Sequence, residues 1–324
     1  MVVGGTPHSP RLWIYLLLSS DSQGWTETGC SLHRCHTYIG GHYFTVRSPD
    51  DSVADRTIDS HQHAWTTETE LPWKNDGPSA VERVVYTADD ALTDMDTLAI
   101  DQACLVATPI HGTGSPYVRD CLTRHPDRFY GILTLDYTAD DVRSSVDDAL
   151  TIPNALGFRI TTDDSQWLAS EALDGFWSAL ESHTDPQVQL LTTPETFGAV
   201  ETVVAENPHV TFVLDHMGSP DPGTHTVPGS AYDGLGTISN YSNVYVKVTH
   251  TPTEEVYPFE DLRPYVRYLL SQFGSDRLLW GSDFIYHFKQ ATPWETLYFL
   301  DEFDCLSRSD RRDLRYRTFK SLVP

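Results

Sequence analysis

Positive charge is scarce in this sequence. Its 324 residues include 22 Lys and Arg against 46 Asp and Glu, which gives a net charge of -24 with histidine neutral. Only four of the basic residues are lysines, whereas Asp supplies 32 of the 46 acidic ones. A chain this acidic repels nucleic acid and anionic membrane surfaces, so neither is expected as a partner. An Asp-rich, Lys-poor composition is also typical of proteins from salt-loving organisms, and we expect a halophilic protein.

Cysteine and long apolar runs are scarce as well. The five cysteines are odd in number and widely scattered, which argues against a disulfide framework and predicts a cytoplasmic protein with reduced thiols. The apolar run at residues 12–18 is too short to span a bilayer. It also makes a poor signal peptide, because only Arg11 precedes it and no clear cleavage site follows.

Residues 1–56 differ in character from the rest of the chain. They mix Gly, Ser, His and isolated aromatic residues without a helical or strand period, and the Asp-rich bias begins only near residue 50. We expect an N-terminal extension here that is either disordered or the product of a gene start placed too early. Residues 57–324 are expected to form one domain, because an α/β barrel of about 250 residues fits that length.

Apolar strand patterns alternate with helical patterns from residue 57 onward. Unbroken apolar runs such as 103–107 are typical of parallel strands buried on both faces, and the spacing over 88–98 predicts a helix. The expected strands begin at Ile58 and continue at 103–107, 129–135, 155–160, 188–191, 210–214, 244–248 and 277–280. Eight strands alternating with helices predict an α/β fold of the (β/α)8 TIM-barrel type, whose active site lies at the C-terminal ends of the strands.

Polar residues follow the predicted strands at the ends where such a site would form. His61 and His63 lie two positions apart on the first strand, so both project from one face with Asp59 and could bind one metal ion. Candidates after later strands are His111, Arg159, Asp215, His216, Lys247, His250 and Asp283. Each alone could be a loop residue, a turn cap or half of a core ion pair. Their occurrence at one end of successive strands favours a shared site.

Several segments resemble the amidohydrolase-related family of metal-dependent hydrolases. Residues 57–65 carry an Asp-x-His-x-His pattern, residues 214–220 read LDHMGSP and residues 278–284 read LLWGSDF. Shorter segments at 126–131, 157–159 and 245–248 add to the resemblance, which runs from about residue 57 to the C-terminus. The most similar group holds the sugar-lactone and dicarboxylate-lactone hydrolases.

The resemblance implies a divalent metal site, with zinc as the expected ion. His61, His63 and Asp283 would be the metal ligands, and three protein ligands suffice for a catalytic zinc with open positions. Metal-using members usually add a histidine at the end of the fifth strand, where this chain has Thr192 and Thr193. Some lactonases of the group use no metal, so a metal-free site remains an alternative, and His250 could stand in for the missing ligand.

The expected activity is hydrolysis, by an activated water, of a lactone or similar ester or amide of a small anionic or sugar-derived metabolite. Asp283 is the candidate base, His216 a candidate catalytic group, and Arg159 would hold a substrate carboxylate. The alternative is metal-dependent, non-oxidative decarboxylation of a small aromatic or unsaturated acid, with His216 or Asp283 as the proton donor. A barrel that binds a metabolite without turning it over is a third interpretation. A small molecule is the expected partner, and assembly into a homo-oligomer is left open.

Overall fold

The chain forms two compact units, residues 1–54 and 55–324. The computed structural model describes residues 56–67, 70–71, 85–251, 253, 255–285 and 291–323, and the backbone of three strands in the first unit. These strands, β1 (Cys30–Ser31), β2 (Arg34–Ile39) and β3 (His42–Arg47), form an antiparallel sheet in that order. The predicted N-terminal extension otherwise lies outside the described residues, apart from Arg56.

The second unit contains the predicted barrel. Its eight strands pair in sequence order, and all seven pairings are parallel. They are β4 (Ile58–Gln62), β5 (Gln102–Val106), β6 (Phe129–Leu133), β7 (Ala155–Thr161), β8 (Gln187–Leu191), β9 (Thr211–Leu214), β10 (Val244–Val248) and β11 (Leu278–Trp280). The alternation read from the sequence is therefore confirmed as a (β/α)8 TIM barrel.

The first strand and the segment that follows the last strand close the ring. The backbone N–H of Asp283 donates to the carbonyl of His61 at 2.8 Å, and the N–H of His63 donates to the carbonyl of Phe284 at 2.9 Å. Gln62 and Phe284 form a parallel bridge between these hydrogen bonds. We call these contacts between residues 61–63 and 283–284 the closing seam. It lies at the residues that the sequence analysis proposed as metal ligands.

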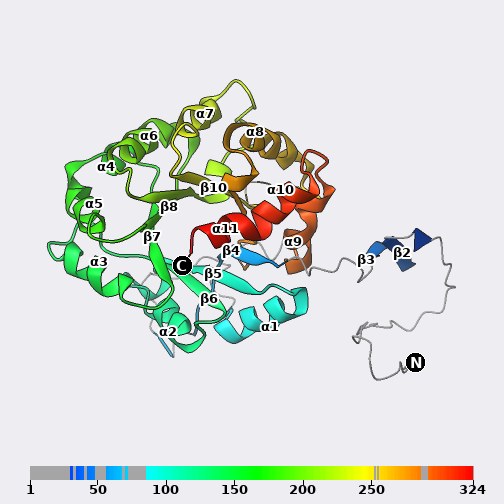
Figure 1. Cartoon of the computed structure of the whole chain (residues 1–324), viewed down its shortest axis with the longest axis horizontal. Coiled ribbons are helices and arrows are strands. Elements are labelled where there is room, and N and C mark those ends of the chain that lie inside the picture. Colours follow the sequence, from blue (N-terminus) through cyan, green and yellow to red (C-terminus); the bar gives the residue numbers. More distant parts are fainter. Residues whose placement is uncertain are drawn as a thin grey trace. The chain divides into compact units, whose positions relative to one another are not determined.

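Helices surround the strands of the barrel (Figure 1). The longer ones are α1 (Ala88–Leu98), α2 (Pro116–Arg124), α3 (Val142–Leu150), α5 (Asp174–Leu180), α6 (Phe197–Glu206), α8 (Arg263–Phe273) and α9 (Pro293–Glu302). Shorter ones are α4 (Ser165–Leu168), α7 (Gly234–Ile238), α10 (Arg308–Arg312) and α11 (Thr318–Ser321). Side-chain caps fix where α1 and α9 begin, because Thr87 and Thr292 each complete a capping box.

Two apolar clusters form the core. The larger one fills the layer between strands and helices, where the indole N–H of Trp280 donates to the carbonyl of Thr296 at 2.7 Å. The smaller one lies within the barrel and includes Ile58, Cys104, Ile132, Leu156, Val213 and Leu279. Phe319 of α11 joins this inner cluster, and α11 crosses the barrel in Figure 1. The polar side chains of the candidate site lie toward the C-terminal ends of the strands, where the active site of this fold forms.

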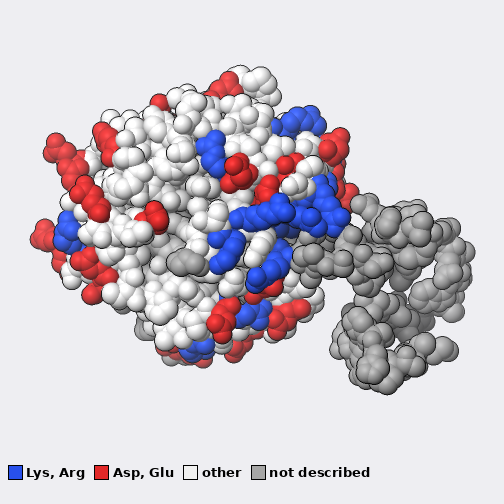
Figure 2. All heavy atoms as spheres, viewed as in Figure 1, with Lys and Arg blue, Asp and Glu red and all other residues white. Residues whose placement is uncertain are grey.

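Basic side chains gather over α10 and α11 on the face shown in Figure 2. Neighbouring carboxylates offset much of this charge: Arg311 and Arg315 pair with Asp301, and Arg317 pairs with Asp313. The two pairs with Asp301 are partly buried, whereas Arg317 is exposed, and an exposed ion pair contributes little to stability. Within the residues that the structure describes, no helix is long and apolar enough to cross a membrane.

Gly157 in β7 gives a direct test of the barrel register. A Cβ atom at this position would lie 1.8 Å from the backbone oxygen of Gln187 on β8, so Gly157→Ala must push two paired strands apart. We expect the free energy of unfolding to fall by about 3 kcal/mol or more in denaturant titrations. Gly198→Ala is the matched control, because nothing lies within 4 Å of its added Cβ in α6. It should stabilise the chain by about 0.5–1 kcal/mol, and equal effects of the two changes would contradict the register.

Candidate active site

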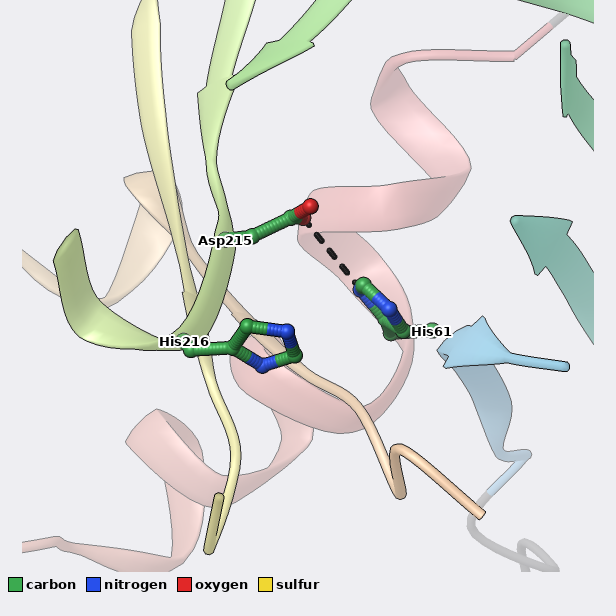
Figure 3. Close-up of side chains that lie close together, drawn as sticks. All are labelled: His61, Asp215 and His216. Carbon is green, nitrogen blue, oxygen red and sulfur yellow. Dashed lines mark ion pairs between the residues drawn. The ribbon is translucent and has the colours of Figure 1, made fainter. Parts of the chain in front are cut away.

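The candidate site forms where the strand ends meet. His61 belongs to β4 and His63 follows it, whereas Asp215 and His216 lie in the short helix η4 (Asp215–Gly218) directly after β9. Figure 3 shows His61 facing Asp215 and His216 across the space between these elements. The rings of His61 and His216 lie 4.7 Å apart between centroids. All four side chains are buried.

The backbone is turned into an unusual conformation at two of the predicted site residues. His216 has φ 51° and Asp283 has φ 52°, a left-handed conformation that side chains with a Cβ rarely adopt. Such conformations persist only where the surroundings impose them, and they cluster at functional sites. At Asp283 the hydrogen bond from its N–H to the carbonyl of His61 contributes this restraint. The turn lets the Asp283 side chain reach both histidines.

His61, His63 and Asp283 place three ligand atoms in a compact triangle. The two Nε2 atoms of the histidines are 3.2 Å apart. Oδ1 of Asp283 lies 3.2 Å from Nε2 of His63 and 3.6 Å from Nε2 of His61. Nδ1 of His63 lies 2.7 Å from the carbonyl of Val106, which can only accept a hydrogen bond. The hydrogen of a neutral His63 is therefore on Nδ1, and Nε2 presents its lone pair to the other two ligand atoms.

This triangle fits a divalent metal ion. Zinc bonds of about 2.0–2.1 Å at tetrahedral angles place neighbouring ligand atoms about 3.3 Å apart, close to the three distances here. The ligands are also of the right chemical type, because imidazole nitrogen and carboxylate oxygen are common zinc donors. A second group of possible ligands, His61, Asp215 and His216, shares His61 with the first. Three donors leave positions open for water and substrate.

The two oxygens of Asp283 face different neighbours. Oδ1 faces His61 and His63, whereas Oδ2 accepts a hydrogen bond from the hydroxyl of Thr251 and lies 3.9 Å from Nδ1 of His216. Burial opposes ionisation of this carboxyl, but the surrounding histidines, His216 first, outweigh it and hold the pKa of Asp283 well below its usual range. Burial lowers the pKa of His216 to about 4, so its ring is neutral near pH 7. One carboxylate can therefore offer one oxygen as a ligand and the other as a base.

A second set of charges lies behind the triangle. Oδ1 of Asp215 lies 3.2 Å from Nζ of Lys247 and 3.2 Å from Nδ1 of His61, and Oδ2 accepts a hydrogen bond from Nε of Arg159 at 2.9 Å. Burial would raise the pKa of Asp215, but Lys247, His61 and Arg159 together hold it well below its usual range. Lys247 therefore forms the core ion pair that was one of its sequence interpretations. The Nε of Arg159 is committed to Asp215, so only its terminal nitrogens could reach a substrate carboxylate.

Three of the candidates read from the sequence lie apart from the triangle. The Asp59 carboxylate does not point with His61 and His63 as strand alternation predicted. It accepts hydrogen bonds from the backbone N–H groups of His61 and Ser282 at 3.0 and 2.9 Å, because the register of β4 shifts between Asp59 and Gln62. His111 packs beside Tyr117, and His250 packs beside Phe259. Neither joins a group of three possible ligands among the described residues.

The sequence interpretation missed three polar residues that line the site. Gln189 of β8 accepts a hydrogen bond from Lys247 at 2.5 Å, Thr249 lies 3.0 Å from Nδ1 of His216, and Thr251 donates to Asp283. A signal for the two threonines was available, because Lys247, Thr249 and Thr251 follow the two-residue alternation of a strand. Gln189 gave no such signal within its apolar strand.

Comparison with known proteins yields a family and several relatives. The amidohydrolase family model matches residues 58–318. L-fucono-1,5-lactonase of Burkholderia ambifaria is 24% identical over 238 residues, which cover 70% of this chain and 79% of that protein. A probable 2-pyrone-4,6-dicarboxylic acid hydrolase from Acinetobacter baumannii, solved with citric acid bound, aligns with a TM-score of 0.70 at 19% identity over 82% of this chain and 98% of its own.

A zinc-bound amidohydrolase from Burkholderia multivorans has the same fold, with a TM-score of 0.70 at 20% identity over 83% of this chain and 100% of its own. The two structural likenesses establish a shared fold, whereas the family model spans the whole barrel from β4 to α11. The site lies on that same stretch of chain, at the strand ends where barrel enzymes carry out their chemistry. The chain belongs to the amidohydrolase family and is a hydrolase.

Proposed function

We propose that this hydrolase opens a lactone ring of a small anionic or sugar-derived metabolite, using a water molecule activated at a divalent metal ion. The observation that carries the proposal is the buried triangle of His61, His63 and Asp283, with ligand atoms 3.2–3.6 Å apart. The similarity to L-fucono-1,5-lactonase supports the reaction class. Nitrogen and oxygen donors in this number favour zinc.

Each side chain of the candidate site has a separate role in the proposed hydrolysis. When bound by His61, His63 and Oδ1 of Asp283, the metal ion supplies positive charge that activates water and polarises the lactone carbonyl. Oδ2 of Asp283 is placed to take the proton of the attacking water and to pass it to the leaving alkoxide. The hydroxyl of Thr249 can donate to Nδ1 of His216, which leaves the hydrogen on Nε2 free to stabilise the developing oxyanion.

The charge balance of the site favours an anionic substrate. Lys247 and Arg159 supply two buried positive charges, and Asp215 and Asp283 supply two negative ones. A divalent ion would leave this set positive, so a substrate carboxylate would reduce the excess charge. The terminal nitrogens of Arg159 are the proposed contact for that carboxylate. Arg159→Lys should therefore raise KM more than it lowers kcat.

Protonation states favour hydrolysis over decarboxylation. A decarboxylase of this kind needs an acid that protonates the carbon losing carbon dioxide. Asp283 and His216, the two candidate acids, have lowered pKa values, well below the usual range for Asp283 and about 4 for His216. Near neutral pH they are suited to accept protons rather than to give them.

The cysteines and the composition support a cytoplasmic, halophilic protein. Cys104 and Cys121 are buried free thiols, which is consistent with the cytoplasmic location proposed from the cysteine pattern. The excess of Asp over Lys supports a halophilic protein. We keep residues 57–324 as the proposed catalytic domain, and activity of a chain that begins at residue 57 would test this boundary.

Asp283→Asn tests the base. The amide retains the shape of the side chain but cannot accept the proton of the attacking water, so kcat on a lactone substrate should fall by roughly 10²–10⁴-fold. Circular dichroism should show an unchanged fold. Asp163→Asn, which removes one exposed carboxylate, is the matched control and should retain wild-type kcat. Retained activity of Asp283→Asn would remove Asp283 from the base role.

A double change, His61→Ala with His63→Ala, tests the metal site. Two of three ligands are lost, so elemental analysis should find about one metal ion per wild-type chain and almost none in the variant. Chelation should abolish wild-type activity. His183→Ala, which removes a histidine paired with Asp147 away from the site, serves as control and should keep its metal. Unchanged metal content in the double variant would contradict the assignment of His61 and His63 as metal ligands.

A further inference from the structure

Lys247 is a buried charge that the proposed reaction does not use. Its side chain is fully enclosed, with 0% exposure. Its Nζ atom lies 3.0 Å from Nδ1 of His61, 2.5 Å from Oε1 of Gln189 and 3.2 Å from Oδ1 of Asp215. An ammonium group can only donate, so it donates to Oε1 of Gln189 and pairs with the charge of Asp215. When Nε2 of His61 binds a metal ion, Nδ1 carries the hydrogen and faces Oδ1 of Asp215 at 3.2 Å, so His61 does not accept from Lys247 in that state. The lysine therefore fills a buried cation pocket formed by Gln189 and Asp215 beside the ring of His61.

The position of this pocket separates Lys247 from the substrate. His61 presents Nε2 to His63 and Asp283 on one side of its ring and Nδ1 to Lys247 and Asp215 on the other. The lysine thus lies behind His61, and its contacts connect to the proposed metal ligands through His61 and Asp215. A buried charge is costly unless partners surround it, so retaining Lys247 here requires Gln189 and Asp215 as its partners.

The pocket also overlaps the second group of possible metal ligands, His61, Asp215 and His216. An ion held by Nδ1 of His61 and Oδ1 of Asp215 would have to share both atoms with the ammonium group. Two positive charges at that distance inside a protein repel strongly. The lysine and a second metal ion therefore exclude each other.

We propose that Lys247 is a positioning residue that acts as the built-in second cation of the site, fixing His61 from behind and limiting the site to one metal ion. Gln189 completes the pocket from β8, the fifth barrel strand. The inference rests on the proposed function, because it concerns the same histidine. It extends that function by assigning a role to a residue that touches neither the substrate nor the first metal ion.

Lys247→Ala is the test, with Lys320→Ala as a control that removes the same charge from an exposed position. Each protein is dialysed against excess Zn²⁺ and its metal content is measured. We expect about one ion per chain for wild type and Lys320→Ala, and about two for Lys247→Ala. The kcat of Lys247→Ala should fall by roughly 10–100-fold with KM little changed. Methylammonium, which can refill the pocket, should restore part of the loss, whereas tetramethylammonium should not.

The outcomes separate this inference from the proposed function. A folded Lys247→Ala that keeps wild-type kcat, or that gains neither a second ion nor rescue by methylammonium, would overturn it. So would wild-type protein that takes up two ions. A metal-free but active wild type would overturn the metal mechanism, while rescue of Lys247→Ala would still support the positioning role. If Lys247→Ala does not fold, Lys247→Met fills the space without the charge, and unchanged kcat in that variant would also refute the inference.

Discussion

Closure of the barrel is the constraint on which the site depends. The backbone hydrogen bonds between His61 and Asp283 and between His63 and Phe284 join the first strand to the segment after the last one. They bring together His61, His63 and Asp283, the proposed metal ligands, which come from segments more than 200 residues apart in sequence. Any change that loosens this seam also changes the distances among Nε2 of His61, Nε2 of His63 and Oδ1 of Asp283. A change that weakens the closure of the barrel should therefore also disturb the geometry of the candidate site.

Pairing of buried charges is the second constraint. Lys247, Arg159 and Asp215 come from three different strands or strand ends, and none is more than 8% exposed. Asp215 gives one oxygen to each cation, so removal of Asp215 would leave two positive charges in the interior without their shared carboxylate. This network supports His61 from behind while Asp283 approaches it from the substrate side. The proposed metal ligands thus lie next to a buried network of charged side chains.

The sequence predicted the barrel and the main candidates because their signals are local. Alternating apolar runs mark the strands, and the spacing of His61 and His63 places both on one face. Asp59 was misplaced because a register shift in β4 breaks that alternation, which a one-strand pattern cannot reveal. The pairing of Arg159 with Asp215 spans 56 residues and depends on the curvature of the whole ring. The direction of His216 depends on a left-handed turn that begins where the strand pattern ends.

X-ray absorption spectroscopy at the zinc edge, on zinc-loaded protein, tests the central claim most directly. The account predicts a first shell of two imidazole nitrogens and light oxygen ligands at about 2.0–2.2 Å, with the outer-shell scattering that imidazole rings produce. The imidazole signal should correspond to two histidines per zinc ion. A shell without imidazole scattering, or one that contains sulfur, would contradict the assignment of His61, His63 and Asp283 as the metal site.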